Sequence, residues 1–312
     1  MSLPIACSLL ARRTLAVLAP ALLLVASDAF AQTSPAPPID PAALVRRAVA
    51  ERLAEDANHR PLRYFLHKQD NHHNIVQEII ETPQGDVALV VASNGRPLSP
   101  VARQRQIDRL HALAANPALQ QHRLSSEQAD QARVDKLLRL LPDAFLYRYA
   151  GSGPCQVTST PDILIPGVAG LPPPATSQPT QLCWHLTFTP NPQWNPPDIE
   201  SEVLRGMAGD VWMEACQDRL VRLSAHLIAS VNFGWGILGH LDKGGTVFFE
   251  QSYVDGGEWE LTRMKLNLTG KALLIKSLGF HITDEMAGFS AVPPDLDYRQ
   301  AIKMLLDSLP AQ

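Results

Sequence analysis

The sequence has no excess of basic residues, because 27 lysines and arginines stand against 31 acidic residues and the formal net charge is −4. Nucleic-acid-binding proteins normally carry a strong basic excess, so this class of protein is excluded. Charge of either sign is also scarce, at 19% of residues against 46% hydrophobic ones. A disordered chain has the opposite balance. The chain is therefore a folded protein with enough apolar residues for a sizeable core.

Several motifs that carry chemistry are absent. There is no C-x-x-C pair, which excludes zinc-ribbon and thioredoxin-like sites, and no H-E-x-x-H or G-x-S-x-G motif. Residues 243–246 (KGGT) weakly resemble a phosphate-binding loop, but they join two predicted strands and favour a hairpin turn. We expect no catalytic residue, no cofactor and no metal ion, although histidines on separate strands leave an assembled metal site open as an alternative.

The N-terminal segment has the pattern of a secretory signal. Arg12 and Arg13 precede an apolar run over residues 14–26, and Ala29 and Ala31 fit an A-x-A cleavage site. The run is shorter than the roughly 20 residues that cross a bilayer. We predict a cleavable signal peptide over 1–31, a flexible spacer over 32–38 and a mature protein in the periplasm.

Three cysteines follow the predicted signal peptide, so at most one internal disulfide can form. Cys155 and Cys183 bracket a proline-rich insertion over residues 156–182. A bond between them would close a loop of roughly 27 residues, worth about 3 kcal/mol in the chain-entropy model. We predict the Cys155–Cys183 disulfide, and we predict that Cys216 is unbonded and buried in an apolar strand.

Hydrophobic periodicity and turn signals predict the elements of the N-terminal half. The expected helices lie at about 40–58, 99–116, 125–142 and 198–204, and the expected strands at 64–69, 74–82, 86–93, 145–150 and 183–189. The third helix is predicted to start at a capping box, residues 125–128 (SSEQ), and to end at Pro142.

From residue 209 onward the sequence alternates between strand and turn. The expected strands are 210–215, 220–229, 231–238, 246–254, 259–269, 272–282 and 285–290, and a last helix begins at Asp295 or Asp297. Short links make neighbouring strands antiparallel, and a long meander must curl through its twist. The sequence thus predicts an α+β fold, a long curved antiparallel sheet or half-barrel against several helices, as a single domain over 39–312.

The aromatic residues of this meander are the candidates for a ligand cavity. A half-barrel face that is too wide for its own side chains leaves an apolar space. The candidates for its lining are Trp212, Phe233, Trp235, Leu238, Phe248 and Trp259. A solid core is the alternative for the same residues. Carboxylates on the predicted strands, Glu78, Glu81, Glu250, Glu258 and Glu260, keep a secreted hydrolase as a weaker alternative.

The run 206–213 (GMAGDVWM), followed by 219–223 (RLVRL), resembles the strand pattern of the outer-membrane lipoprotein-sorting superfamily. This superfamily contains the LolA and LolB lipoprotein carriers and the RseB-type envelope-stress sensors. The likeness covers mainly residues 198–292. It implies a half-barrel over helices with an apolar cavity for acyl chains, and it transfers no catalytic residue.

The functional expectation is therefore a non-enzymatic periplasmic protein that binds a lipid or a lipidated protein and contacts the membrane peripherally. The alternative is an envelope sensor or assembly protein that binds a protein partner, with the insertion 156–182 as its contact loop.

Overall fold

The computed structural model describes residues 40–57, 59–155, 181–233, 239–254, 258–272 and 276–309. The predicted signal peptide and spacer lie outside these residues, as do nearly all of the insertion and the cavity candidates Trp235 and Leu238.

The described strands form one 13-stranded antiparallel sheet. They are β1 (Leu62–Gln69), β2 (Asn74–Ile80), β3 (Val87–Ser93), β4 (Arg96–Pro97), β5 (Phe145–Pro154), β6 (Leu182–Pro190), β7 (Met207–Glu214), β8 (Arg219–Leu227), β9 (Val231–Phe233), β10 (Gly239–Leu241), β11 (Thr246–Val254), β12 (Glu258–Ala272) and β13 (Lys276–Ala291). Their order is β4-β3-β2-β1-β13-β12-β11-β8-β7-β6-β5. The short strands β9 and β10 pair with each other, and β10 also pairs with β12. The predicted fold class is confirmed.

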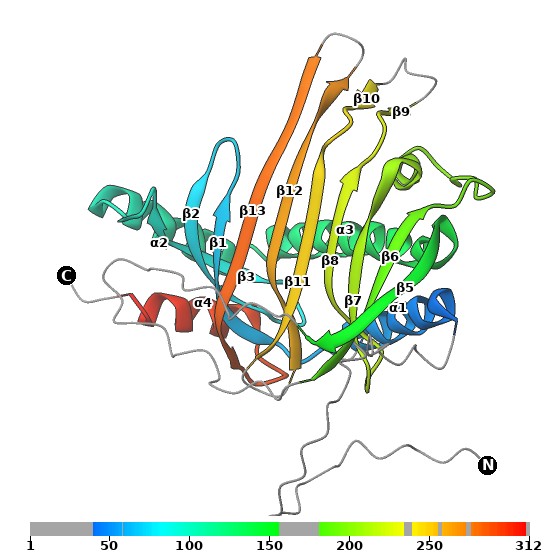
Figure 1. Ribbon diagram of the computed structural model, residues 1–312. Helices are drawn as coiled ribbons and strands as arrows, with labels where there is room; N and C mark the ends of the chain where they lie inside the picture. The colour runs from blue at the N-terminus through cyan, green and yellow to red at the C-terminus, as the bar shows by residue number, and fades with distance from the viewer. Residues whose placement is uncertain are drawn as a thin grey trace, which may run out of the picture.

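Helices pack on this sheet in two groups (Figure 1). Helix α1 (Pro41–Ala57) and the long helix α3 (Pro117–Ala144) pack together against the end of the sheet that contains β5 to β8. Helices α2 (Pro100–Ala115) and α4 (Tyr298–Asp307) pack against β2 and β3 at the opposite end. A helix of 28 residues is about 42 Å long. Helix α3 therefore runs across the strands and reaches from one end of the sheet to the other (Figure 1).

Side-chain caps explain where the helices begin. The carboxylate of Asp40 accepts from the N–H of Ala43, and Ser99 accepts from the N–H of Ala102. Asp297 forms a capping box with Gln300 at the start of α4. The starts at Asp40 and Ser99 are as predicted, and Asp297 is one of the two residues predicted to begin the last helix. The predicted short helix near 198–204 is a 3-10 helix, η1 (Glu200–Gly206).

The predicted start of the third helix is wrong. Helix α3 begins at Pro117, because the side chain of Asn116 accepts from the N–H of Leu119 and proline suits the first helical position. The helix continues through Ser125, whose hydroxyl donates to the carbonyl of Gln121 one turn earlier. The pair Asn116–Pro117 therefore ends one helix and starts the next.

The two last predicted strands are one strand. Strand β13 runs without a break from Lys276 to Ala291 and pairs with both β12 and β1. The gap between the two predicted strands, residues 283 and 284, lies opposite Gln69 and Lys68 of β1, and Glu285 lies opposite His67. Pairs of polar residues thus continue strand β13 at a point where its hydrophobic residues no longer alternate with polar ones.

The predicted disulfide is present. The Cα atoms of Cys155 and Cys183 are 4.8 Å apart, at the ends of the paired strands β5 and β6. Cys216 lies outside the disulfide, as predicted. The prediction that it is buried is wrong, because it is exposed. Strand β7 ends at Glu214, whose carboxylate accepts from the N–H groups of Cys216 and Gln217 and holds them in the turn before β8.

Candidate functional site: an apolar cavity beneath helices α1 and α3

A cavity of about 460 Å³ lies between helices α1 and α3 and the sheet. Its size falls within the range of small-molecule binding sites, about 300–1,000 Å³. Helix α1 contributes Val45, Ala48 and Val49, which follow helical spacing on one face, and helix α3 contributes Leu137, Leu138 and Leu141. Several strands contribute alternate residues, such as Val247 and Phe249 of β11, whereas β8 contributes the consecutive residues 219–223. The wall of the cavity is therefore mostly aliphatic.

Two clusters of buried residues flank this space. One joins helix α1 to β6 and β7 through Leu44, Leu186 and Met213. The other joins the end of α3 to β5, β6 and η1 through Phe145, Phe188 and residues around them. Both clusters supply residues to the cavity wall. The cavity is thus a gap between two well-packed regions, and its walls are held from both sides.

Charged residues line one end of the cavity. Glu51, Arg52 and Glu55 come from the last turns of α1, and Arg219 comes from the start of β8. Both terminal nitrogens of Arg219 donate to the carboxylate of Glu55. Burial lowers the pKa of Arg219, and the nearby charge of Arg52 lowers it further. This ion pair ties the helix to the sheet at the charged end.

The four described aromatic candidates do not line this cavity. Trp212 alternates with Val211 and Met213, which do line it, so its ring lies on the other face and stacks on His185 with 4.6 Å between ring centroids. Phe248 alternates in the same way with Val247 and Phe249. The alternation of each strand was visible in the sequence. The part of the lining that comes from helices α1 and α3, about a third of its residues, was not assigned from the sequence.

The other two aromatic candidates are part of packed regions. Trp259 is 4% exposed and lies in a cluster with Cys183 and Val221. Phe233 packs on the cluster that flanks the cavity.

The described carboxylates that suggested a hydrolase lie outside the cavity lining and contact basic side chains there. Glu250 is fully buried and pairs with Arg263 at 2.9 Å. Glu78 pairs with Arg63 and accepts from Ser308. Glu81 and Glu260 both lie beside His59, with nitrogen–oxygen distances of 2.7 and 3.6 Å. The side chain of Glu258 lies outside the described residues.

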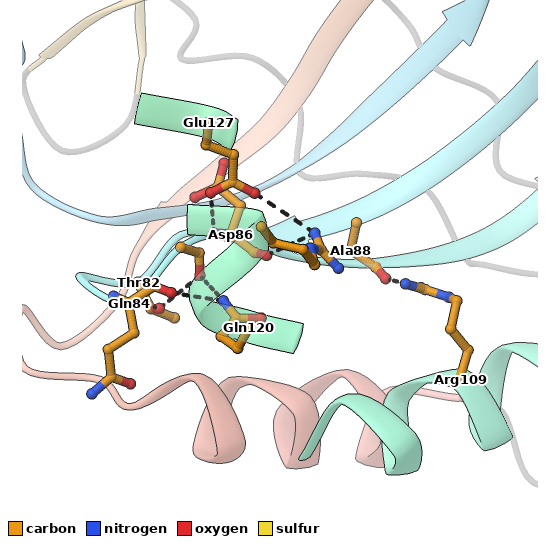
Figure 2. A network of polar contacts seen from close by, with 9 residues as sticks. Thr82, Gln84, Asp86, Ala88, Arg109, Gln120 and Glu127 are labelled. Atoms are coloured by element: carbon orange, nitrogen blue, oxygen red, sulfur yellow. Dashed lines mark hydrogen bonds and ion pairs between the residues drawn. The ribbon is translucent and has the colours of Figure 1, made fainter. Parts of the chain in front are cut away.

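A second polar cluster joins helix α3 to the turn between β2 and β3 (Figure 2). The side-chain amide of Gln120 donates to the carbonyls of Gln84 and Gly85, and Arg123 donates to the carbonyl of Asp86. The N–H of Asp86 donates to Glu127 at 3.2 Å. The bonds go mainly to backbone groups of the turn, so this cluster holds the helix in place.

The Asp86 carboxyl group in this cluster has an unusual pKa. Burial raises the pKa of Asp86 to about 7, and the negative charges of Glu81 and Glu127 add to the effect. Raised carboxyl pKa values occur in acid–base catalysis and in buried structural sites alike. Asp86 does not line the cavity, which favours the structural role.

Within the described ranges, no three His, Cys, Asp or Glu side chains are grouped so that they could hold a metal ion. Among the same residues, no helix is long and apolar enough to cross a membrane. Comparison of the chain with protein-family models, with curated proteins and with solved structures finds no match. The site must therefore be interpreted from its own geometry.

Proposed function

We propose that this protein is an exported, non-enzymatic carrier that binds an acyl chain in the cavity beneath helices α1 and α3. The observation that carries the proposal is the aliphatic wall of a cavity of about 460 Å³. Burial of acyl methylenes contributes roughly 0.8 kcal/mol each, so an apolar cavity of this size is a strong site for such a chain.

Two features of the sequence and fold support the proposed compartment. The Cys155–Cys183 disulfide supports an oxidising environment, because cytosolic proteins rarely keep such bonds. The signal-peptide pattern over residues 1–31 supports export, and we propose the periplasm as the place of action. In that compartment the acyl chain would come from a lipid or from a lipidated protein.

A series of straight-chain fatty alcohols tests the proposal without any charged headgroup. The measurement is native mass spectrometry of the protein purified without detergent. The affinity should rise roughly fourfold for each added methylene until the cavity is full. No bound alcohol at any chain length would contradict the proposal.

Filling the cavity with a larger side chain provides the matched variant. Leu137 is partly buried and faces the cavity from α3, so L137W should block it and reduce alcohol binding at least about tenfold. Leu146 of β5 is 48% exposed and outside the cavity lining, so L146W is the control and should bind like the wild type. Circular dichroism of both variants confirms that the fold is retained. Equal binding by L137W and L146W would place the acyl chain elsewhere.

A further inference from the structure

The size and charge distribution of the cavity say more about the ligand, and this step rests on the proposed function. At about 30 Å³ for a group the size of a water molecule, 460 Å³ holds roughly fifteen methylene-sized groups. A volume of this size matches one acyl chain of about that length. We propose that the ligand is a single-chain amphiphile with a zwitterionic headgroup, and that the headgroup lies at the Glu51–Arg52–Glu55–Arg219 end.

The strand register shows that this cavity has a polar end and an apolar end. Strand β8 begins at Arg219, and the neighbouring end of β11 carries Gln251, opposite Leu261 of β12. At the other end of the same strands, Met207 of β7 pairs with Leu227, and Val247 pairs with Leu266. All the lining residues at that far end are apolar. A bound amphiphile would therefore lie along the strands with its headgroup beside Arg219.

The charges at the polar end are balanced. Glu51 and Glu55 supply two negative charges, and Arg52 and Arg219 supply two positive ones. Arg222 also borders the cavity, but its guanidinium lies over the Trp212 and Phe248 rings, 5.2 and 5.1 Å from their centroids. That stacking places its charge on the opposite face of the sheet.

A headgroup with a single charge would be attracted by two of these four side chains and repelled by the other two. A carboxylate would face Glu51 and Glu55, and an amine would face Arg52 and Arg219. A headgroup that carries one anionic and one cationic group can pair with both. Nε of Arg219 is a buried donor that has no hydrogen-bond partner within the described part of the chain, so an acceptor from the ligand would satisfy it. A phosphate oxygen of a phosphoethanolamine headgroup would supply that acceptor.

The test compares ligands with the same single chain and different headgroups. The panel is lauroyl lysophosphatidylethanolamine, laurate, dodecylamine and dodecanol, with dilauroyl phosphatidylethanolamine as the two-chain ligand. Affinities are measured below the micelle concentration by isothermal titration. The zwitterionic lysolipid should bind about tenfold more tightly than laurate or dodecylamine, as expected for an added charged hydrogen bond. The two-chain ligand should bind at least about tenfold more weakly than the lysolipid.

Charge-removing variants of α1 test the position of the headgroup. Arg52→Gln should weaken lysolipid binding about tenfold and shift the preference toward dodecylamine, whereas Glu51→Gln should shift it toward laurate. We choose Arg52 and Glu51 because a substitution of Arg219 or Glu55 would also break the ion pair that ties α1 to the sheet. Arg133 of α3 is exposed and pairs with Asp130, so Arg133→Gln is the control and should change nothing. Dodecanol should bind all variants equally.

The outcomes separate the two proposals. Equal affinity for all single-chain headgroups, or a preference for laurate or dodecylamine, would overturn the zwitterionic headgroup while acyl-chain binding stands. Binding of the two-chain lipid as tight as that of the lysolipid would overturn the single-chain inference. Failure of every ligand, dodecanol included, would overturn the proposed function itself.

Discussion

Asp86 is a carboxylic acid whose surroundings favour its neutral form, so folding should depend on pH through this residue. Its pKa rises to about 7 because of burial and the nearby Glu81 and Glu127, and Arg123 and His59 only partly offset this. An unfolded chain ionises the same carboxyl near pH 4. Between these two values the folded protein binds more protons than the unfolded one, so stability falls as the pH rises.

The variant Asp86→Asn removes this dependence. At pH 4 the carboxyl group is protonated in the folded state, so the variant should differ little from the wild type. At pH 8 the variant should be more stable, by on the order of 2–4 kcal/mol. Urea unfolding at both pH values measures the difference. A variant that is equally stable or less stable than the wild type at pH 8 would show that Asp86 is not destabilising when ionised.

At the scale of elements, strands β7 and β8 approach each other closely at Gly209. A Cβ atom at this position would lie 2.0 Å from the carbonyl oxygen of Ser224 and 2.8 Å from Cα of Ala225. Both are backbone atoms of β8, so the strands would have to move apart. These strands also form part of the cavity wall through Val211 and Leu223. The glycine therefore fixes the spacing of the sheet beside the site.

Gly209→Ala should destabilise the protein by about 1–3 kcal/mol, the usual cost of a group inserted into a packed region. Gly153 in β5 is the matched control, because nothing lies within 4 Å of a Cβ atom placed there. Gly153→Ala should cost much less. Thermal unfolding of the two variants decides the matter, and a similar loss in both would mean that the β7–β8 approach is not responsible.

The elements could be predicted from the sequence where a local signal determines them. Asp40 and Ser99 each start a helix as expected, and Asp297 is one of two expected starts, since a cap acts on N–H groups within three residues. The sequence predicts Asn116 only as a helix end, whereas this residue both ends α2 and caps α3. The cavity could not be placed, since its lining depends on which face of α1 and α3 meets which strand. That pairing is a long-range property that no local pattern contains.

At the scale of the whole molecule, the disulfide closes the chain between two neighbouring strands. Cys155 and Cys183 lie 28 residues apart in sequence and join the ends of β5 and β6. Strand β5 is the last strand of the sheet and pairs only with β6 among the described strands. The same edge of the sheet carries Tyr147 and Phe188, which line the cavity. Loss of the disulfide should therefore affect both stability and the site.

The double variant Cys155→Ala/Cys183→Ala should lose about 3 kcal/mol of stability, because the unfolded chain regains the entropy that the closed loop removes. Reduced wild type should match the double variant in urea unfolding. Cys216→Ser is the control, since Cys216 is exposed and outside the disulfide, and it should change stability little. Alcohol binding should weaken in the double variant if the edge strand frays beside the cavity. A double variant as stable as the oxidised wild type would show that the β5–β6 edge is held by its backbone ladder and core packing alone.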